Sequence, residues 1–174
     1  MRIHPLRPED DRAAFDCGDP VLDRFLREFA LQNARRHHIG VTYVAEERGV
    51  VLGYVTVAAC SIERDGAPSA MEELPAYPLP AIRIARLAVD RRAGGRGIAT
   101  ALLGAAFDLG LEMAERVGCV GYLVDAKPQA AGFYGRFGFE RVAAVVGLAA
   151  ARPRQTLMFL SLAAVMEARD DARG

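Results

Sequence analysis

Two spacings of apolar residues alternate along the chain, and each change of spacing marks a boundary between an expected helix and an expected strand. Apolar residues recur every three or four positions over residues 21–30 and 98–113, which predicts two amphipathic helices. Shorter runs rich in Val, Tyr and Thr are typical of strands. The strands predicted from apolar runs cover residues 3–7, 41–46, 50–61, 81–89, 119–125, 139–146 and 155–162.

The predicted helices are bounded by residues that favour helix ends. Asp19 is suited to cap an N-terminus and Pro20 to occupy the first helical position, so the first helix should begin there and end near Arg36. The second should cover residues 95–117 and stop at Gly118, because glycine readily adopts the left-handed backbone that follows a helix.

The order of these elements sets the expected fold class. A third, short helix is expected at residues 129–137, and residues 62–80 read as a long, proline-containing loop. Strands and helices in this order predict an α/β (α+β) fold, with a mixed central β-sheet flanked by helices. No internal repeat is visible, so we expect a single domain over residues 1–166 and a polar tail at 167–174.

Composition excludes several classes of protein. The 174 residues are 52% apolar and 25% charged, which is typical of a globular domain. No apolar run is long enough to span a membrane, and the N-terminus does not resemble a signal peptide, so a cytoplasmic location is expected. Cys17, Cys60 and Cys119 are isolated, and their spacing predicts neither a disulfide framework nor a metal site.

The net charge of zero is compatible with a local basic site. There are 22 basic and 22 acidic residues, which argues against a general nucleic-acid binder. Residues 35–38 nevertheless form a basic cluster, Arg-Arg-His-His, at the end of the first helix. The cluster either complements the helix dipole or contacts a nucleic acid or partner. Arg83 and Arg86 interrupt an apolar strand, which indicates either a substrate cleft or ion pairs.

The main candidate site is a glycine cluster between a strand and a helix. The apolar strand ending at residues 87–89 is followed by Gly94, Gly95 and Gly97 and then by the long helix. Backbone N–H groups at such a turn point outward, and the helix dipole adds positive charge. The arrangement therefore predicts a site for an anion such as a phosphate.

Two common phosphate motifs do not fit this cluster. A P-loop would end in Gly-Lys-Ser or Gly-Lys-Thr, whereas Gly97 is followed by Ile98 and Ala99. A dinucleotide fingerprint needs a third glycine, and Thr100 stands in its place. An ordinary glycine turn remains the alternative for the loop taken alone.

The loop and a second segment together resemble the GNAT N-acetyltransferases. Gly94-Gly95-Arg96-Gly97-Ile98-Ala99 is similar to the family's pyrophosphate loop, with glycine at the first position, where Gln or Arg is usual. Phe133-Tyr134, followed by Gly138-Phe139, is similar to its second signature. The resemblance implies acetyl-CoA as co-substrate, no metal, and Tyr134 as the acid that protonates the leaving sulfur. The cofactor-binding residues that it implies are Leu87, Ala88, Val89, Gly94, Gly95, Arg96, Gly97, Ile98, Ala99, Thr100 and Phe133.

A narrower resemblance concerns the GNAT toxins of type II toxin–antitoxin modules. Five short segments carry it, at residues 15–18, 22–26, 42–45, 53–58 and 124–127. It implies a toxin that acetylates the α-amino group of aminoacyl-tRNA and blocks translation. It also implies a homodimer held inactive by a ribbon-helix-helix antitoxin.

The strand before the loop agrees with an α-amine acceptor. Residues 81–89 contain no acid, and an α-amino group with a pKa near ~8 is partly neutral at pH 7, so water could take its proton. Glu46 or Glu47 could still serve as a base. A small-molecule amine, a protein N-terminus and a non-catalytic CoA-binding role remain alternatives. The candidates for tRNA phosphate contacts are Arg35, Arg36, Arg83, Arg91 and Arg92.

Overall fold

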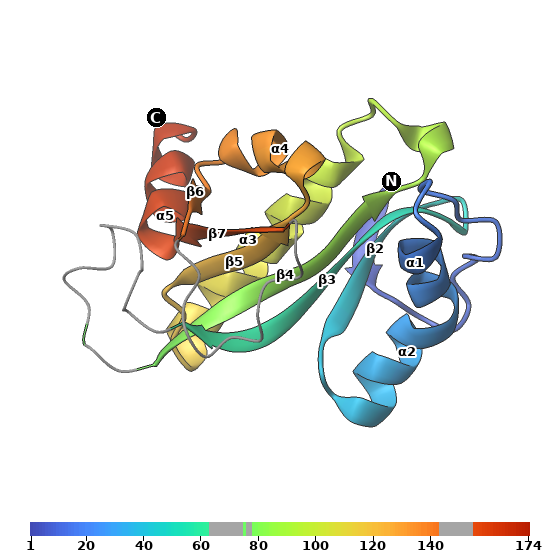
Figure 1. Ribbon diagram of the computed structural model, residues 1–174, viewed down its shortest axis with the longest axis horizontal. Helices are drawn as coiled ribbons and strands as arrows, with labels where there is room; N and C mark the ends of the chain where they lie inside the picture. The colour runs from blue at the N-terminus through green and yellow to red at the C-terminus, as the bar shows by residue number, and fades with distance from the viewer. Residues whose placement is uncertain (63–74, 76–77, 143–154) are drawn as a thin grey trace. The chain divides into compact units, whose positions relative to one another are not determined.

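A computed structural model describes residues 1–62, 75, 78–142 and 155–174 (Figure 1). Its strands form one mixed sheet in the order β1-β2-β3-β4-β5-β7-β6, with helices beside it, which confirms the predicted fold class. The strands are β1 (Arg2–Pro5), β2 (Val41–Glu47), β3 (Val50–Ile62), β4 (Leu79–Val89), β5 (Gly121–Ala126), β6 (Glu140–Arg141) and β7 (Thr156–Ser161).

The helices begin and end close to the predicted positions. Asp19 caps α1 by accepting hydrogen bonds from the N–H groups of Val21 and Leu22. The first helix is one winding segment over residues 20–37, in which π-helical turns interrupt the α-helix. The α-helices are α1 (Pro20–Arg24), α2 (Ala30–Gln32), α3 (Ile98–Arg116), α4 (Ala131–Gly135) and α5 (Leu162–Asp171), and the π-helical turns of the first segment are Phe25–Phe29 and Asn33–His37.

Several predicted boundaries are wrong. The glycine loop lies outside α3, which begins at Ile98 rather than near residue 95. The strand predicted at residues 139–146 is only the two-residue β6 within the described part, and residues 143–146 lie outside it. Most of the predicted loop at residues 62–80 also lies outside the described residues. The chain ends in α5, which the polar character of the tail did not suggest; Ser161 caps this helix through the N–H of Ala164.

The chain divides into two compact units that share β3, β4 and α3. The first unit contains Met1–Ala58 and Ile84–Asp108, and the second contains Ala59–Arg83 and Leu109–Gly174. In the first unit β1, β2 and β3 pair antiparallel. In the second, β7 pairs antiparallel with both β5 and β6.

In the first unit, neighbouring residues of β3 pack against helices on opposite faces of the sheet. The fully buried Tyr54 contacts Phe15 and Phe25, with ring centroids 5.6 and 6.1 Å away, and its hydroxyl donates to the Leu22 carbonyl. The adjacent Gly53 faces α3, where a Cβ would lie 2.9 Å from Ile98. Glycine is therefore required there, and this close approach fixes the start of α3 beside the end of β4.

In the second unit, apolar residues of β5 and β7 pack together with the ends of β3 and β4. The core contains Ile62, Leu79, Leu123 and Phe159, each at most 3% exposed. Among the described helices, none is long and apolar enough to cross a membrane.

Candidate functional site

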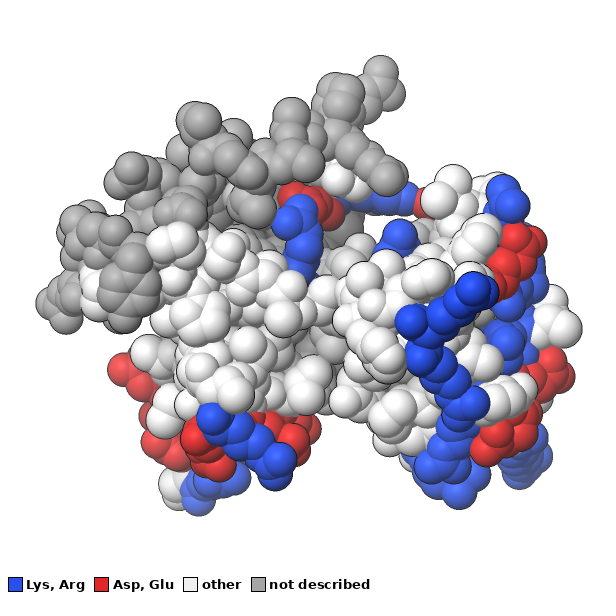
Figure 2. Space-filling view, turned by 90° about the horizontal axis from the view of Figure 1, so that it is seen from below, with Lys and Arg blue, Asp and Glu red and all other residues white. Residues whose placement is uncertain are grey.

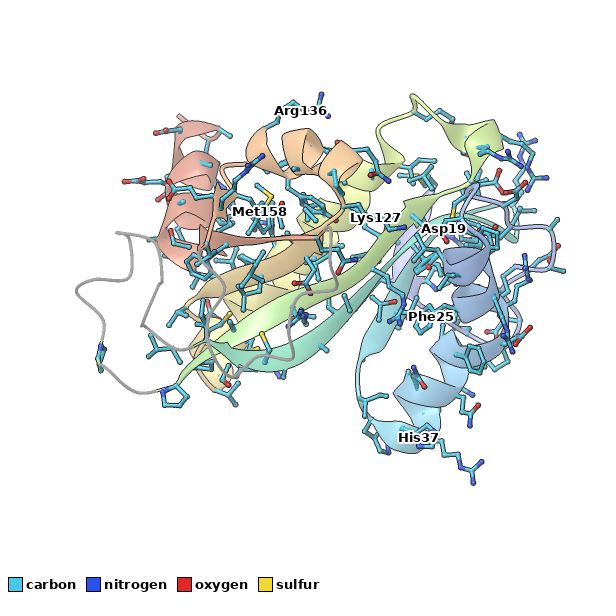
Figure 3. The ribbon with its side chains drawn as sticks, in the orientation of Figure 1. Asp19, Phe25, His37, Lys127, Arg136 and Met158 are labelled. Atoms are coloured by element: carbon cyan, nitrogen blue, oxygen red, sulfur yellow. The ribbon has the colours of Figure 1, made fainter. Side chains whose placement is uncertain are left out.

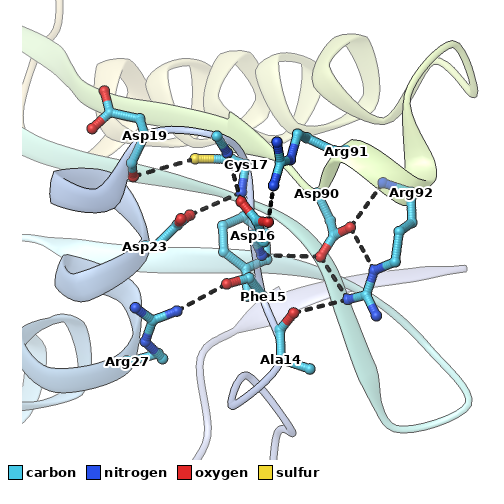
Figure 4. Close-up of polar contacts among 11 residues, drawn as sticks. Ala14, Phe15, Asp16, Cys17, Asp19, Asp23, Arg27, Asp90, Arg91 and Arg92 are labelled. Atoms are coloured by element: carbon cyan, nitrogen blue, oxygen red, sulfur yellow. Dashed lines mark hydrogen bonds and ion pairs between the residues drawn. The ribbon is translucent and has the colours of Figure 1, made fainter.

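The turn that leads into the glycine loop is built around the carboxylate of Asp90 (Figure 4). Asp90 follows β4 and is only 1% exposed. It accepts hydrogen bonds from the N–H groups of Arg92 and Asp16 at 2.9 and 3.1 Å, and from the Arg92 guanidinium at 2.7 and 2.9 Å. The Arg92 guanidinium, followed by these backbone N–H groups, holds the pKa of Asp90 far below its usual range.

The same turn is tied to the segment that precedes α1. Arg92 also donates to the Ala14 carbonyl at 3.0 Å, and the N–H of Arg91 donates to the Asp16 carbonyl at 2.9 Å. The side chains of Arg91 and Asp16 form an ion pair, and this pair lowers the pKa of Asp16. Residues 14–16 and 90–92, far apart in the sequence, therefore form one hydrogen-bonded framework within the first unit (Figure 4).

The glycine loop leaves that framework with its backbone exposed. Gly95 and Gly97 have φ of +75° and +73°, a conformation that a side chain disfavours, and a Cβ at either would meet nothing within 4 Å. The N–H of Ala101 donates to the Gly97 carbonyl at 3.0 Å, so the N–H groups of Ile98, Ala99 and Thr100 precede the first intrahelical bond. These N–H groups and the open space over the glycines suit a diphosphate.

The one charged side chain of the loop, Arg96, pairs with Glu47 at the end of β2. The Arg96 Nη2 atom lies 3.0 Å from both carboxylate oxygens, and this contact lowers the pKa of Glu47. The neighbouring Glu46 is 3% exposed and accepts from the Gly49 N–H and from Arg2, which lower its pKa. Their lowered pKa values and their existing hydrogen bonds make both glutamates weak proton acceptors.

Tyr134 lies in the second unit in an aromatic environment. It is 5% exposed, and its ring meets those of Phe133 and Phe139 edge-on at centroid distances of 5.3 and 5.4 Å. Phe133 in turn contacts Phe137 at 5.1 Å. Burial raises the pKa of Tyr134 to about 12, so its hydroxyl keeps its proton at neutral pH.

The five arginines predicted to contact tRNA fall into two groups. Arg83 forms an ion pair with Asp125, and Arg91 and Arg92 form the pairs described above. Arg86, the other arginine of β4, lies 3.7 Å above the Phe25 ring. On the face drawn in Figure 2, basic and acidic side chains lie beside one another in several places, and a row of basic side chains crosses the right-hand part.

The second group consists of Arg35 and Arg36 at the end of the first helical segment. Both are exposed, and the described part of the chain gives neither a carboxylate partner. The adjacent His37 marks the end of the segment opposite Asp19, whereas Phe25 lies between them (Figure 3). The segment ends at His38, which has a left-handed φ of +54°.

The described residues give little support for a metal site, for a carboxylate base on β4 or for a cysteine nucleophile. They contain no group of three or more His, Cys, Asp or Glu side chains arranged to hold a metal ion. β4 carries no acid along its length. The Cys60 thiol is half-buried and its pKa is raised to about 11 by burial, so it is a poor nucleophile.

The fold and the loop define a class of acetyltransferase, and comparison with known proteins agrees. Residues 38–141 match the acetyltransferase (GNAT) domain family. The chain is 36% identical over 134 residues to a tRNA-acetylating toxin of Mycobacterium tuberculosis, covering 75% of this chain and 79% of the toxin. The chain therefore belongs to the GNAT acetyltransferase family.

Solved structures extend the similarity to nearly the whole chain. AtaT complexed with acetyl-methionyl-tRNAfMet superposes with a TM-score of 0.81 at 26% identity, over 95% of this chain and 96% of AtaT. An AtaT tyrosine-to-phenylalanine mutant bound to acetyl-CoA and the C-terminus of the antitoxin AtaR has a TM-score of 0.75 at 25% identity, covering 94% of each chain. A KacT mutant, at 24% identity, shares the fold with a TM-score of 0.81 over 95% of this chain and 97% of KacT.

The framework around Asp90 was not predicted from the sequence. An acidic residue directly after a buried strand, two positions before an arginine, is a signal for a capped turn that could have been used. The partners at residues 14–16 could not have been found in this way, because they lie more than seventy positions earlier in the chain. The pairing of Glu47 with Arg96 is likewise visible only in the structure.

Proposed function

We propose that this protein is an acetyl-CoA-dependent toxin that acetylates the α-amino group of aminoacyl-tRNA and so blocks translation. The observation that carries the proposal is the 36% identity to a tRNA-acetylating toxin over three quarters of the chain. The similarity to AtaT in complex with acetyl-methionyl-tRNAfMet supports the same acceptor. We take residues 1–166 as the catalytic domain, and α5 continues past this boundary to Asp171.

The glycine loop holds the diphosphate of acetyl-CoA in this proposal. The N–H groups of residues 95–100 bind it, whereas that of Gly94 donates to the Arg91 carbonyl, and the exposed backbone at Gly95 and Gly97 allows close approach. Leu87, Ala88 and Val89, the last residues of β4, offer backbone groups to the pantetheine arm and the oxyanion. Phe133 contributes an apolar contact.

Tyr134 acts as the acid in the transfer step. The acceptor nitrogen attacks the thioester carbonyl, the carbon–sulfur bond breaks, and the sulfur leaves as a thiolate. Because the pKa of Tyr134 is about 12 and that of a thiol is near ~8.5, the phenol stabilises the leaving sulfur mainly as a hydrogen-bond donor. Full protonation of the sulfur can be completed from solvent.

Water accepts the proton that the amine releases. β4 has no acid, and the buried Glu46 is engaged with Arg2. An α-amino group, unlike a lysine side chain, is partly neutral at pH 7 and needs no strong base. The absence of a carboxylate base along β4 thus favours an α-amine over a lysine acceptor.

Arg35 and Arg36 are the favoured tRNA contacts, since both are exposed at one helix end. Arg83, Arg91 and Arg92 contribute less, because phosphate would compete with their carboxylate partners. The protein acts in the cytoplasm as a homodimer, and a ribbon-helix-helix antitoxin holds it inactive. Complexes of AtaT with AtaR support an antitoxin partner.

The direct test supplies labelled acetyl-CoA and a pool of charged tRNAs to the purified protein. We expect label in N-acetyl amino acids released from tRNA by mild base, and none on deacylated tRNA, free amino acids or small amines. Label on free amines or protein N-termini instead would refute the tRNA acceptor. Binding of CoA without transfer to any acceptor would identify a non-catalytic module.

A further inference from the structure

We propose that Glu47 competes with the diphosphate of the cofactor for Arg96, so that this carboxylate lowers the affinity of the glycine loop for acetyl-CoA. The inference rests on the proposed function only for the position of the cofactor. It gives Glu47 a role that is neither that of a base nor that of a purely structural residue.

The competition follows from which nitrogen of Arg96 is occupied. Both Glu47 oxygens lie 3.0 Å from one atom, Nη2. A guanidinium grips a phosphate with two parallel N–H groups, formed either by Nη1 with Nη2 or by Nε with Nη2. Nη2 supplies one N–H group to each fork, so a carboxylate held at this atom competes with a phosphate for the Arg96 guanidinium.

Arg96 is placed to change partner. It lies between the left-handed Gly95 and Gly97, in the loop whose N–H groups suit a diphosphate, and its side chain is 46% exposed. It is also the only charged residue of the 94–99 segment, in which glycine occupies the position where Gln or Arg is usual. Arg96 is therefore the positively charged side chain of this loop that could pair with a phosphate bound to the backbone.

Glu47 is placed to release it. The carboxylate is 38% exposed and also lies 3.8 Å from the amino group of Met1, with Arg48 beside it in the chain. When Arg96 turns to the phosphate, Glu47 remains solvated and close to a second positive charge. Removing the Glu47 charge therefore shifts the exchange toward the phosphate-bound arrangement.

The test is a double-mutant cycle on ligand binding. Glu47→Gln, Arg96→Gln and the double variant are compared with the wild type by titration calorimetry at low ionic strength. The ligands are CoA, dephospho-CoA and pantetheine. Glu28→Gln and Arg24→Gln serve as matched controls, because they break an exposed pair of the same unit, with Nε and Oε2 2.8 Å apart. Thermal unfolding confirms that every variant is folded.

The two single variants should change the affinity for CoA in opposite directions. Glu47→Gln tightens CoA binding about two- to fivefold, the range that an exposed ion pair allows, and Arg96→Gln weakens it about five- to tenfold. In the Arg96→Gln background the effect of Glu47→Gln disappears. Both effects persist with dephospho-CoA, which keeps the diphosphate, and vanish with pantetheine, which has no phosphate.

Other outcomes would overturn the proposal. Weaker binding by Glu47→Gln would mean that Glu47 positions Arg96 for the ligand. Loss of both effects with dephospho-CoA would assign Arg96 to the 3′-phosphate, and equal effects with pantetheine would make the pair structural. Because the assay contains no acceptor, a failure of tRNA acetylation leaves this test intact, and an absent Glu47 effect leaves the proposed function intact.

Discussion

The glycine loop and the surroundings of Tyr134 are stabilised by opposite kinds of interaction. The loop follows a framework of charges in which the buried Asp90 accepts four hydrogen bonds from Arg92 and Asp16. Tyr134 lies among the rings of Phe133 and Phe139. In the proposed function the loop presents N–H groups to a diphosphate, which suits polar support, and Tyr134 keeps its proton, which an apolar site favours.

The difference is also visible in protonation. Hydrogen bonds from arginine lower the pKa values of Asp16 and Asp90, and burial raises that of Tyr134 to about 12. Over the neutral range the carboxylates stay ionised and the phenol stays neutral. Neither region therefore changes its charge state near pH 7, which agrees with the roles proposed for them.

The largest expected effect comes from removing the hydroxyl in the aromatic region. Tyr134→Phe should lower kcat for acetyl transfer about 10²- to 10³-fold, because the leaving sulfur loses its hydrogen-bond donor. The affinity for CoA and the melting temperature should hardly change, since the ring contacts persist. Tyr122→Phe, a buried tyrosine of the same unit, is the control and should turn over normally. Unchanged turnover by Tyr134→Phe would remove its role as the acid.

The next effect concerns the charge framework. Asp90→Asn should lower the free energy of unfolding by about 2–3 kcal/mol, because an amide replaces a buried acceptor of charged donors. Urea denaturation measures this loss. Glu28→Gln, which breaks an exposed pair, should cost less than about 1 kcal/mol. A similar loss in both variants would contradict the framework.

The stability that Asp90 contributes should also depend on pH. The folded-state pKa of Asp90 is below its ordinary value of 3.8, so its stabilising contribution is present above about pH 4 and is lost as pH falls. Urea midpoints measured from pH 6 to 2.5 should fall more steeply for the wild type than for Asp90→Asn. Parallel curves would show that another carboxylate dominates the acid response.

A smaller effect is expected within the loop itself. Gly97→Ala should weaken CoA binding about tenfold and destabilise the protein by about 1 kcal/mol, because alanine disfavours the φ of +73° there. Gly104→Ala lies inside α3, where a Cβ meets nothing within 4 Å, and should stabilise by about 0.5–1 kcal/mol without changing CoA binding. Full CoA affinity in Gly97→Ala would argue against the loop as the diphosphate site.

The smallest effect is expected at the exposed arginines. The double variant Arg35→Gln and Arg36→Gln should raise KM for aminoacyl-tRNA severalfold and reduce the salt dependence of binding by about one charge per lost phosphate contact. CoA binding should not change. Arg116→Gln, at the exposed end of α3, is the control. If the control matches the double variant, the effect is that of net charge alone.

Much of the fold and part of the candidate site could be predicted because their signals are local. Asp19 and Pro20 predicted the start of α1, and apolar runs predicted the strands, because capping and strand propensity act within a few residues. The glycine loop was visible because its chemistry lies within six consecutive positions. The exact start of α3 was not, because Gly95 and Gly97 adopt left-handed backbone that a periodicity argument does not show.

The sequence by itself determined the family and predicted the glycine loop and Tyr134 as site residues, because each is encoded in contiguous residues with a recognisable pattern. Only the tertiary structure decided which arginines are already paired, that Glu47 holds Arg96, and that Asp90 joins residues 14–16 to the loop. These pairings link positions far apart in the chain, and the residues next to a charged side chain in the sequence do not identify its partner. Burial depends equally on which parts of the folded chain surround a residue, so the raised pKa of Tyr134 follows only from the tertiary structure.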